Sequence, residues 1–60
     1  MEIGISKVKG NIQFTSTSKA FREEYGIVRE VPEGCLFSIM NDLANWANNE
    51  AEEECFFYMN

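Results

Sequence analysis

Four glutamates lie close together in the last quarter of the chain: Glu50, Glu52, Glu53 and Glu54. Clustered carboxylates can bind a hard cation, exchange protons with a substrate or attract a positively charged partner. A calcium loop alternates its ligands around a glycine, which this segment lacks, and a glycosidase needs a cleft that a 60-residue chain can barely enclose. The cluster therefore indicates attraction of a basic partner, with no metal site.

Side chains that could act as nucleophiles lack the groups that would activate them. The chain contains no histidine, so a serine or cysteine has no imidazole base. The four glycines are scattered singly, unlike those of a phosphate-binding loop. Cys35 and Cys55 fit neither a zinc-ligand pair nor a CxxC redox pair, and we expect two reduced thiols, one or both of them buried. The sequence predicts a protein that is not an enzyme and needs no cofactor.

Charge is divided unevenly along the chain. The net charge is −5, yet all five basic residues lie in the first 29 positions, and from residue 30 onward there are seven acidic residues and no basic one. In one interpretation the halves pair inside the fold, with Lys7 and Lys9 against the glutamates. In the other, the acidic half presents a negative face to a basic partner. Glu50 supports the second interpretation. It is three and four residues from Glu53 and Glu54, so the three would repel one another on one face of a helix, and a functional role would explain why this cost is tolerated.

Direct binding to nucleic acid is not expected, because so few basic residues release few phosphate counterions and the acidic half repels the backbone. Carboxylates can instead occupy the groove of a nucleic-acid-binding protein in place of phosphates, and their charge speeds the encounter. A nucleic-acid enzyme or a toxin with a basic surface is therefore the expected type of partner.

An apolar run, Cys55-Phe56-Phe57-Tyr58-Met59, follows the glutamates. Aromatic residues at this place usually pack into a core, but they also dominate the centres of protein interfaces. If exposed, Phe57 and Tyr58 together with Trp46 would anchor a partner that the glutamates attract. The predicted partner-binding residues are Glu50, Glu52, Glu53, Glu54, Trp46, Phe57 and Tyr58.

The elements that position these residues must come from one small domain spanning residues 1–60, because a chain of this length builds only a thin core. Hydrophobic residues make up 45% of the chain, which is too apolar for intrinsic disorder. The first residues show neither a signal peptide nor an apolar run long enough for a membrane span. We therefore expect a cytoplasmic protein that does not enter a membrane.

The first elements predicted are a β-hairpin and a short helix. Gly10-Asn11 suits a two-residue turn that pairs Lys9 with Ile12 and Lys7 with Phe14, and that register gathers four apolar side chains on one face. The four are Ile3, Ile5, Ile12 and Phe14. A helix over residues 19–25 follows, capped by residues 15–18 and ended by Gly26.

Two arrangements remain open for the second half, and both are α+β. In the first, Val31-Pro32-Glu33-Gly34-Cys35 forms a turn, residues 27–31 and 35–39 make a second hairpin, and Asn41-Asp42 caps a carboxy-terminal helix packed on one face of the sheet. In the alternative, of order ββαβαβ, a helix spans about residues 35–49 and a strand spans 55–59. The first arrangement is preferred, because turn residues and alternation agree there.

The function expected from these features is that of a non-enzymatic, acidic, protein-binding module that inhibits or regulates a basic partner by covering its functional surface. In composition the chain is similar to phage- and plasmid-encoded inhibitors and antitoxins, which would act in the host cytoplasm. The alternative is a self-associating structural or assembly protein, for example a homodimer extended through an unpaired edge strand.

Overall fold

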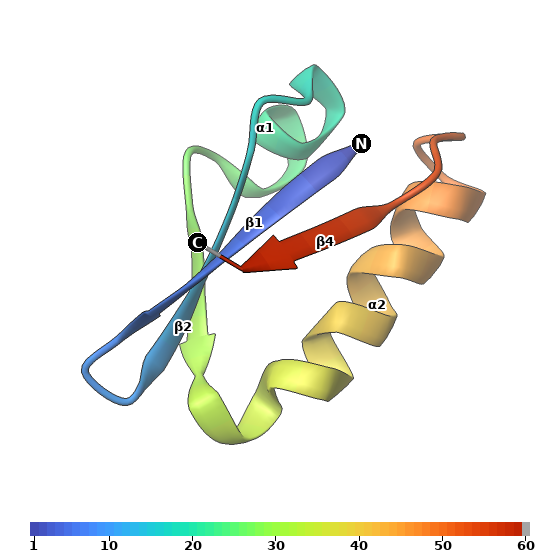
Figure 1. Cartoon of the computed structure of the whole chain (residues 1–60). Coiled ribbons are helices and arrows are strands. Elements are labelled where there is room, and N and C mark those ends of the chain that lie inside the picture. Colours follow the sequence, from blue (N-terminus) through green and yellow to red (C-terminus); the bar gives the residue numbers. More distant parts are fainter. Residues whose placement is uncertain (60) are drawn as a thin grey trace.

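A four-stranded sheet and two helices make up the computed structural model of the chain, which describes residues 1–59 (Figure 1). The elements are β1 (Glu2–Val8), β2 (Asn11–Ser16), α1 (Lys19–Tyr25), β3 (Arg29–Pro32), a 3₁₀ turn (Glu33–Cys35), α2 (Leu36–Asn49) and β4 (Phe56–Met59). The strand order is β3-β2-β1-β4, with β4 parallel to β1 and the other neighbours antiparallel. The expected α+β class is confirmed.

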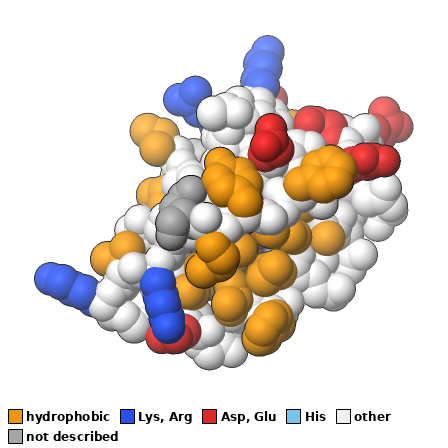
Figure 2. All heavy atoms as spheres, viewed as in Figure 1, with side chains coloured by type: hydrophobic (Ala, Val, Ile, Leu, Met, Phe, Trp, Pro, Cys, Tyr) orange, Lys and Arg blue, Asp and Glu red, His pale blue; other side chains and the backbone are white. Residues whose placement is uncertain are grey.

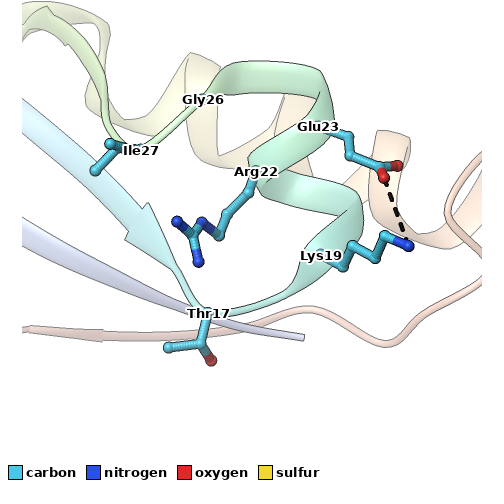
Figure 3. Close-up of a pocket in the computed structure, with 6 residues that line it drawn as sticks. All are labelled: Thr17, Lys19, Arg22, Glu23, Gly26 and Ile27. Atoms are coloured by element: carbon cyan, nitrogen blue, oxygen red, sulfur yellow. Dashed lines mark ion pairs between the residues drawn. The ribbon is translucent and has the colours of Figure 1, made fainter.

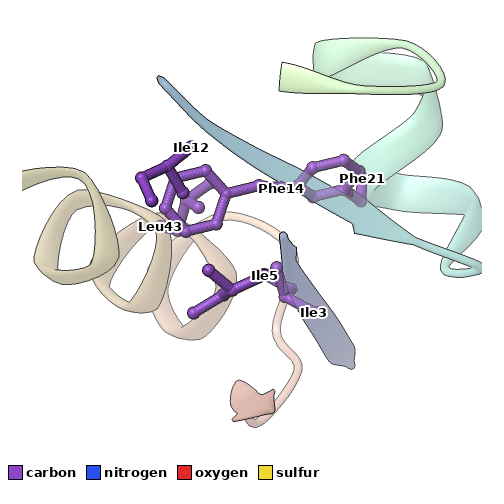
Figure 4. Packing of buried hydrophobic residues seen from close by; sticks show 6 residues of the cluster. All are labelled: Ile3, Ile5, Ile12, Phe14, Phe21 and Leu43. Atoms are coloured by element: carbon purple, nitrogen blue, oxygen red, sulfur yellow. The ribbon is translucent and has the colours of Figure 1, made fainter. Parts of the chain in front are cut away.

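The core lies between one face of the sheet and both helices (Figure 4). Its fully buried members are Ile3 and Ile5 of β1, Ile12 and Phe14 of β2, Phe21 of α1, and Leu43 and Ala47 of α2. Since both helices contribute to one cluster, they cover the same face of the sheet. The other face carries polar side chains along β1 and β2, and there Glu30 accepts hydrogen bonds from the amides of Asn11 and Gln13.

The first hairpin is confirmed, but its turn lies one residue earlier than expected. Lys9 and Gly10 form the two-residue turn, with φ of 47° and 82°, as a type I′ turn requires. Lys7 therefore pairs with Ile12 and Ile5 with Phe14. Compared with the expected register the pairing is displaced by two residues, and because side chains alternate with a period of two, the four apolar residues still share one face.

Replacing Gly10 by alanine should lower the free energy of unfolding by about 1 kcal/mol, because a Cβ disfavours positive φ. An added Cβ would meet no atom within 4 Å, so the cost is conformational and not steric. Lys9→Asn should have the opposite sign and raise the free energy of unfolding by less than this amount, since Asn-Gly is the preferred pair in this turn. Urea denaturation of both variants checks the prediction. A neutral Gly10→Ala would contradict the left-handed turn.

Helix α1 has the expected bounds. Gly26 ends it with a φ of 86° and donates its N–H to the carbonyl of Arg22 at 3.0 Å. Ser18 occupies the N-cap position, but its hydroxyl does not cap the helix; it donates to Glu53 at 3.3 Å. Thr15 and Ser16, expected among the capping residues, belong to β2.

The second hairpin is not formed, and the alternative order ββαβαβ is the one found. Residues Leu36–Asn49 are helical, β3 pairs with β2, and the structure ends in β4. Gly34 lies in the 3₁₀ turn leading into α2 and does not adopt the positive φ of a glycine bulge. Six apolar residues explain the preference for a helix, because they recur at helical spacing and all pack inward: Leu36, Ile39, Met40, Leu43, Trp46 and Ala47.

Candidate functional site

The connection between α2 and β4 holds the four glutamates. The backbone N–H of Glu50 donates to the carbonyl of Trp46 at 2.8 Å, and that of Glu53 donates to the carbonyl of Ala47 at 2.9 Å, so the connection stays close to the end of α2. Glu52 turns the chain with a φ of 55°. The side chains of Glu50, Glu52 and Glu54 are exposed. The carboxy-terminal end of α2 carries the negative end of the helix dipole, and no basic residue in its last turn offsets it. The dipole and the glutamate side chains therefore both make this end of the molecule negative.

Glu53 differs from the other three because it already has partners within the molecule. Its carboxylate lies 3.5 Å from the amino group of Met1 and accepts the hydrogen bond of Ser18. The Met1 amino group also donates to the carbonyl of Glu54. Glu53 therefore ties together the start of β1, the start of α1 and the connection into β4.

Pairing between the basic and the acidic half of the chain is found in part, through Lys7 and Glu33, but within residues 1–59 no lysine pairs with the four clustered glutamates. Lys7 pairs with Glu33 at 2.7 Å, and Lys19 pairs with Glu23 at 3.8 Å. Within residues 1–59, the ion pair between Glu53 and Met1 is the only one that involves a glutamate of the cluster. The carboxylates of Glu50, Glu52 and Glu54 are thus exposed, and no cationic group of the described residues is paired with them.

Trp46 belongs to an aromatic cluster inside the fold. Its ring lies 5.0 Å from that of Tyr25 and 6.4 Å from that of Phe21, both in edge-on geometry. Arg29 covers the Tyr25 ring at 4.7 Å, and burial raises the pKa of the Tyr25 hydroxyl, an effect that the charge of Arg29 opposes. Trp46 is half-buried by this packing. It therefore belongs to the fold near the end of α2 and does not project into solvent as an anchor for a partner.

Phe57 and Tyr58, the other two expected anchors, point to opposite sides of the sheet. Phe57 packs edge-on against Phe14 at 6.5 Å and is half-buried on the helix side. Tyr58 points to the open face and is 48% exposed. Phe56, two residues earlier on the same face, is 57% exposed, and Met59 is 66% exposed.

Figure 2 shows hydrophobic side chains gathered over β4 and the facing part of α2, with acidic residues grouped at the end where the connection enters β4. Sequence reasoning missed Phe56, Met59 and Phe37, the last of which is 81% exposed on α2. Alternation along β4 could have revealed Phe56, because an inward Phe57 places both its neighbours outward. Helical spacing could likewise have revealed Phe37, because a helix that buries Leu36, Ile39 and Met40 places residue 37 outside its apolar face.

An apolar groove of about 340 Å³ opens between β4 and the first turns of α2. It is lined by Ile5, Leu36, Phe37, Met40, Phe57, Tyr58 and Met59. None of these side chains is charged, so the groove suits an apolar segment. Together with the three free carboxylates, it makes β4 and its entry the candidate binding site.

A second hollow, of about 350 Å³, lies beside α1 and is lined largely by polar and charged residues (Figure 3). Arg22 points across it toward Thr17, while Lys19 and Glu23 are paired at its rim. Ile27, 77% exposed, forms its apolar side. Two of its lining residues, Thr17 and Lys19, flank Ser18, which donates to Glu53, so one side of the hollow lies near the connection between α2 and β4.

The two cysteines are free and neither is fully buried, in contrast to the expectation that at least one would be. Cys35 is exposed at the start of α2, and Cys55 is half-buried just before β4. Burial raises the pKa of the Cys55 thiol, and the nearby amino terminus partly opposes this. The raised pKa disfavours a reactive thiolate at Cys55.

Groups of three or more Cys, Asp and Glu side chains placed to hold a metal ion do not occur within residues 1–59. Over the same residues, neither helix has the length and apolar character needed to cross a membrane. When the chain was compared with models of protein families, with curated proteins and with solved structures, none of the three comparisons gave a match.

Proposed function

We propose that this chain is an acidic, non-enzymatic binding module that inhibits or regulates a basic protein by covering its functional surface. The observation that carries the proposal is the position of Glu50, Glu52 and Glu54. All three are exposed, none of them forms an ion pair within residues 1–59, and they precede a strand with exposed aromatic side chains.

The two kinds of side chain have different roles in such a complex. The negative charge of the exposed carboxylates would increase the rate of association with a basic surface. Added salt would screen this attraction and lower the rate. Tyr58 and Phe56 would supply the desolvated contacts that hold the partner, since aromatic residues carry a large share of interface energy. Trp46 and Phe57 support this surface from inside, and Glu53 fixes the connection to the rest of the fold.

The partner that fits is a protein with a basic groove or patch, such as a nucleic-acid enzyme or a toxin, in which carboxylates can stand in for phosphates. The cytoplasm is the proposed compartment, in keeping with two free thiols. A phage or plasmid origin agrees with the acidic composition and small size and forms part of the same proposal.

Affinity capture from bacterial lysate at low and high salt tests the proposal. The wild-type chain is compared with the triple variant Glu50→Gln, Glu52→Gln, Glu54→Gln and with a control that removes the same charge elsewhere. That control is Glu23→Gln, Glu24→Gln, Asp42→Asn, which changes three exposed acidic residues on α1 and α2, outside the connection and the strands. A basic protein should be recovered with the wild type and the control, and its association with the first variant should slow about tenfold or more at low salt.

Each variant must first be shown to fold by circular dichroism. Replacing the three free carboxylates should leave thermal stability unchanged or slightly raised, because like-charge repulsion is relieved. If both triple variants capture the same partner equally well, the acidic connection is not the binding surface and the proposal fails.

A further inference from the structure

We propose that the outer edge of β4 is a homodimer interface, at which two copies pair antiparallel about a two-fold axis through Phe57 and join their sheets into one of eight strands. The dimer uses Phe56 and Tyr58, which the proposed function assigns to a basic partner, so the two associations compete for β4 but are tested by different variants. The proposal rests on the chemistry of the two sheet edges, the direction of the backbone groups and the distribution of charge along β4.

The two edges of the sheet differ in how they resist pairing. At one edge, β3 carries Arg29, Glu30 and Pro32, and charge and proline are the usual means by which proteins block an edge strand. At the other edge, β4 consists of Phe56-Phe57-Tyr58-Met59, without charge, proline or glycine. Of the two, β4 is the edge that invites another strand.

The backbone of β4 presents its free groups at alternate residues. Phe56 donates its N–H to the carbonyl of Met1 at 2.9 Å, so Phe56 and Tyr58 direct their polar groups toward β1. By alternation, Phe57 and Met59 direct their N–H and C=O groups away from the sheet. An antiparallel strand centred on Phe57 places Phe57 opposite Phe57 and Met59 opposite Cys55 of the second copy, and both pairs are then of the hydrogen-bonded type.

The same register matches side chains on both faces. On the open face, Phe56 of each copy lies opposite Tyr58 of the other, and such aromatic cross-strand pairs stabilise a sheet. On the helix face, the side chains of Phe57 and Met59 meet the second strand beside the apolar groove that Phe37 and Met40 line. One strand thus covers exposed apolar surface on both faces, which a helix lying in the groove would not do.

Charge selects the antiparallel direction. In a parallel pair, Glu54 of one copy would lie beside Glu54 of the other. In the antiparallel pair centred on Phe57, six residues separate them along the strands, or roughly 20 Å at about 3.4 Å per residue. That distance exceeds the Debye length of about 8 Å at physiological salt, so the acidic ends repel only weakly.

The exposed surface is sufficient for a weak dimer. With about 200 Å² for each large side chain, the exposed fractions of Phe37, Phe56, Tyr58 and Met59 amount to roughly 500 Å² per copy. The side-chain surface available in two copies is therefore about 1,000 Å², which is the lower limit for a specific interface. A dimer that dissociates on dilution is therefore expected, with Glu50, Glu52 and Glu54 still exposed at both ends.

Sedimentation equilibrium of the pure protein, from about 1 μM to about 1 mM, tests the proposal. The mass should rise from 6.9 kDa toward twice that value. Met59→Pro removes an outward N–H that β1 does not use, and Met59→Glu places a carboxylate near Glu54 of the second copy. Both variants should raise the dissociation constant about tenfold or more, whereas Ile27→Glu, with the same charge change beside the other edge strand, should leave it unchanged.

Amide hydrogen exchange adds a measurement at single residues. The N–H of Phe57 should become protected as the protein concentration rises, and not in Met59→Pro. A chain that stays monomeric over the whole range overturns the proposal, as does a dimer that both Met59 variants retain. The variant lacking the charges of Glu50, Glu52 and Glu54 should dimerise at least as well as the wild type, so failure of the dimer is distinguishable from failure of the proposed function.

Discussion

Phe21→Ala should leave most of the protein unfolded at room temperature. Phe21 is fully buried, belongs to the core cluster and contacts both Tyr25 and Trp46. Truncating a buried phenylalanine costs about 3–5 kcal/mol, and a single core in a chain of this length rarely supplies more than about 3–5 kcal/mol in total. Far-ultraviolet circular dichroism and urea denaturation would show the loss.

Phe37→Ala is the matched control, because it removes the same side chain from a position that is 81% exposed. It should change the free energy of unfolding by less than about 0.5 kcal/mol. Equal losses in the two variants would contradict the helical phase of α2, which turns Phe37 away from the core.

Asn41→Pro should destabilise the protein by about 3 kcal/mol or more. Asn41 lies inside α2, where proline removes a backbone hydrogen bond and clashes with the preceding turn. Asn41→Ala should instead stabilise by a few tenths of a kcal/mol, since alanine has the higher helix propensity at an exposed interior position.

The same pair of variants separates the two arrangements considered for the second half of the chain. If Asn41 capped a helix that began there, alanine would cost about 1 kcal/mol by removing the capping oxygen. Thermal unfolding of the alanine variant therefore reports on the start of α2 by the sign of its effect.

The first half of the fold could be predicted because local signals agree there. Alternation assigned Ile3, Ile5, Ile12 and Phe14 to one face, and Gly26 marked the end of α1. The position of the turn was wrong because Lys9 adopts positive φ, which its residue type does not indicate.

The second half was harder because two short-range patterns conflict. Pro32 and Gly34 suit a hairpin turn, while the residues after them recur at helical spacing. Burial decides between the patterns, because a helix from Leu36 places Leu43 and Ala47 in the core along with the half-buried Trp46. The parallel pairing of β4 with β1 is a long-range contact that no local pattern encodes.

The candidate site could be predicted only in composition. Clustering of the glutamates and aromatic residues was visible in the sequence, but their individual environments depend on tertiary contacts. Glu53 is tied to Met1 and Ser18, and Trp46 is held by Tyr25 and Phe21. The residues left exposed on β4 and α2 follow from strand order and helical phase.

Pairing of the first and last strands also affects the order in which the fold assembles. Glu2 lies beside Phe56, so almost the whole chain must be enclosed before β4 can dock. In contrast, a two-residue turn joins β1 to β2, and the 12 residues that include α1 join β2 to β3. Strand β4 should therefore form late and be among the first elements to open in the native state. Any molecule that pairs with β4 acts on this opening as well, because binding to the closed form lowers the population in which the strand is released.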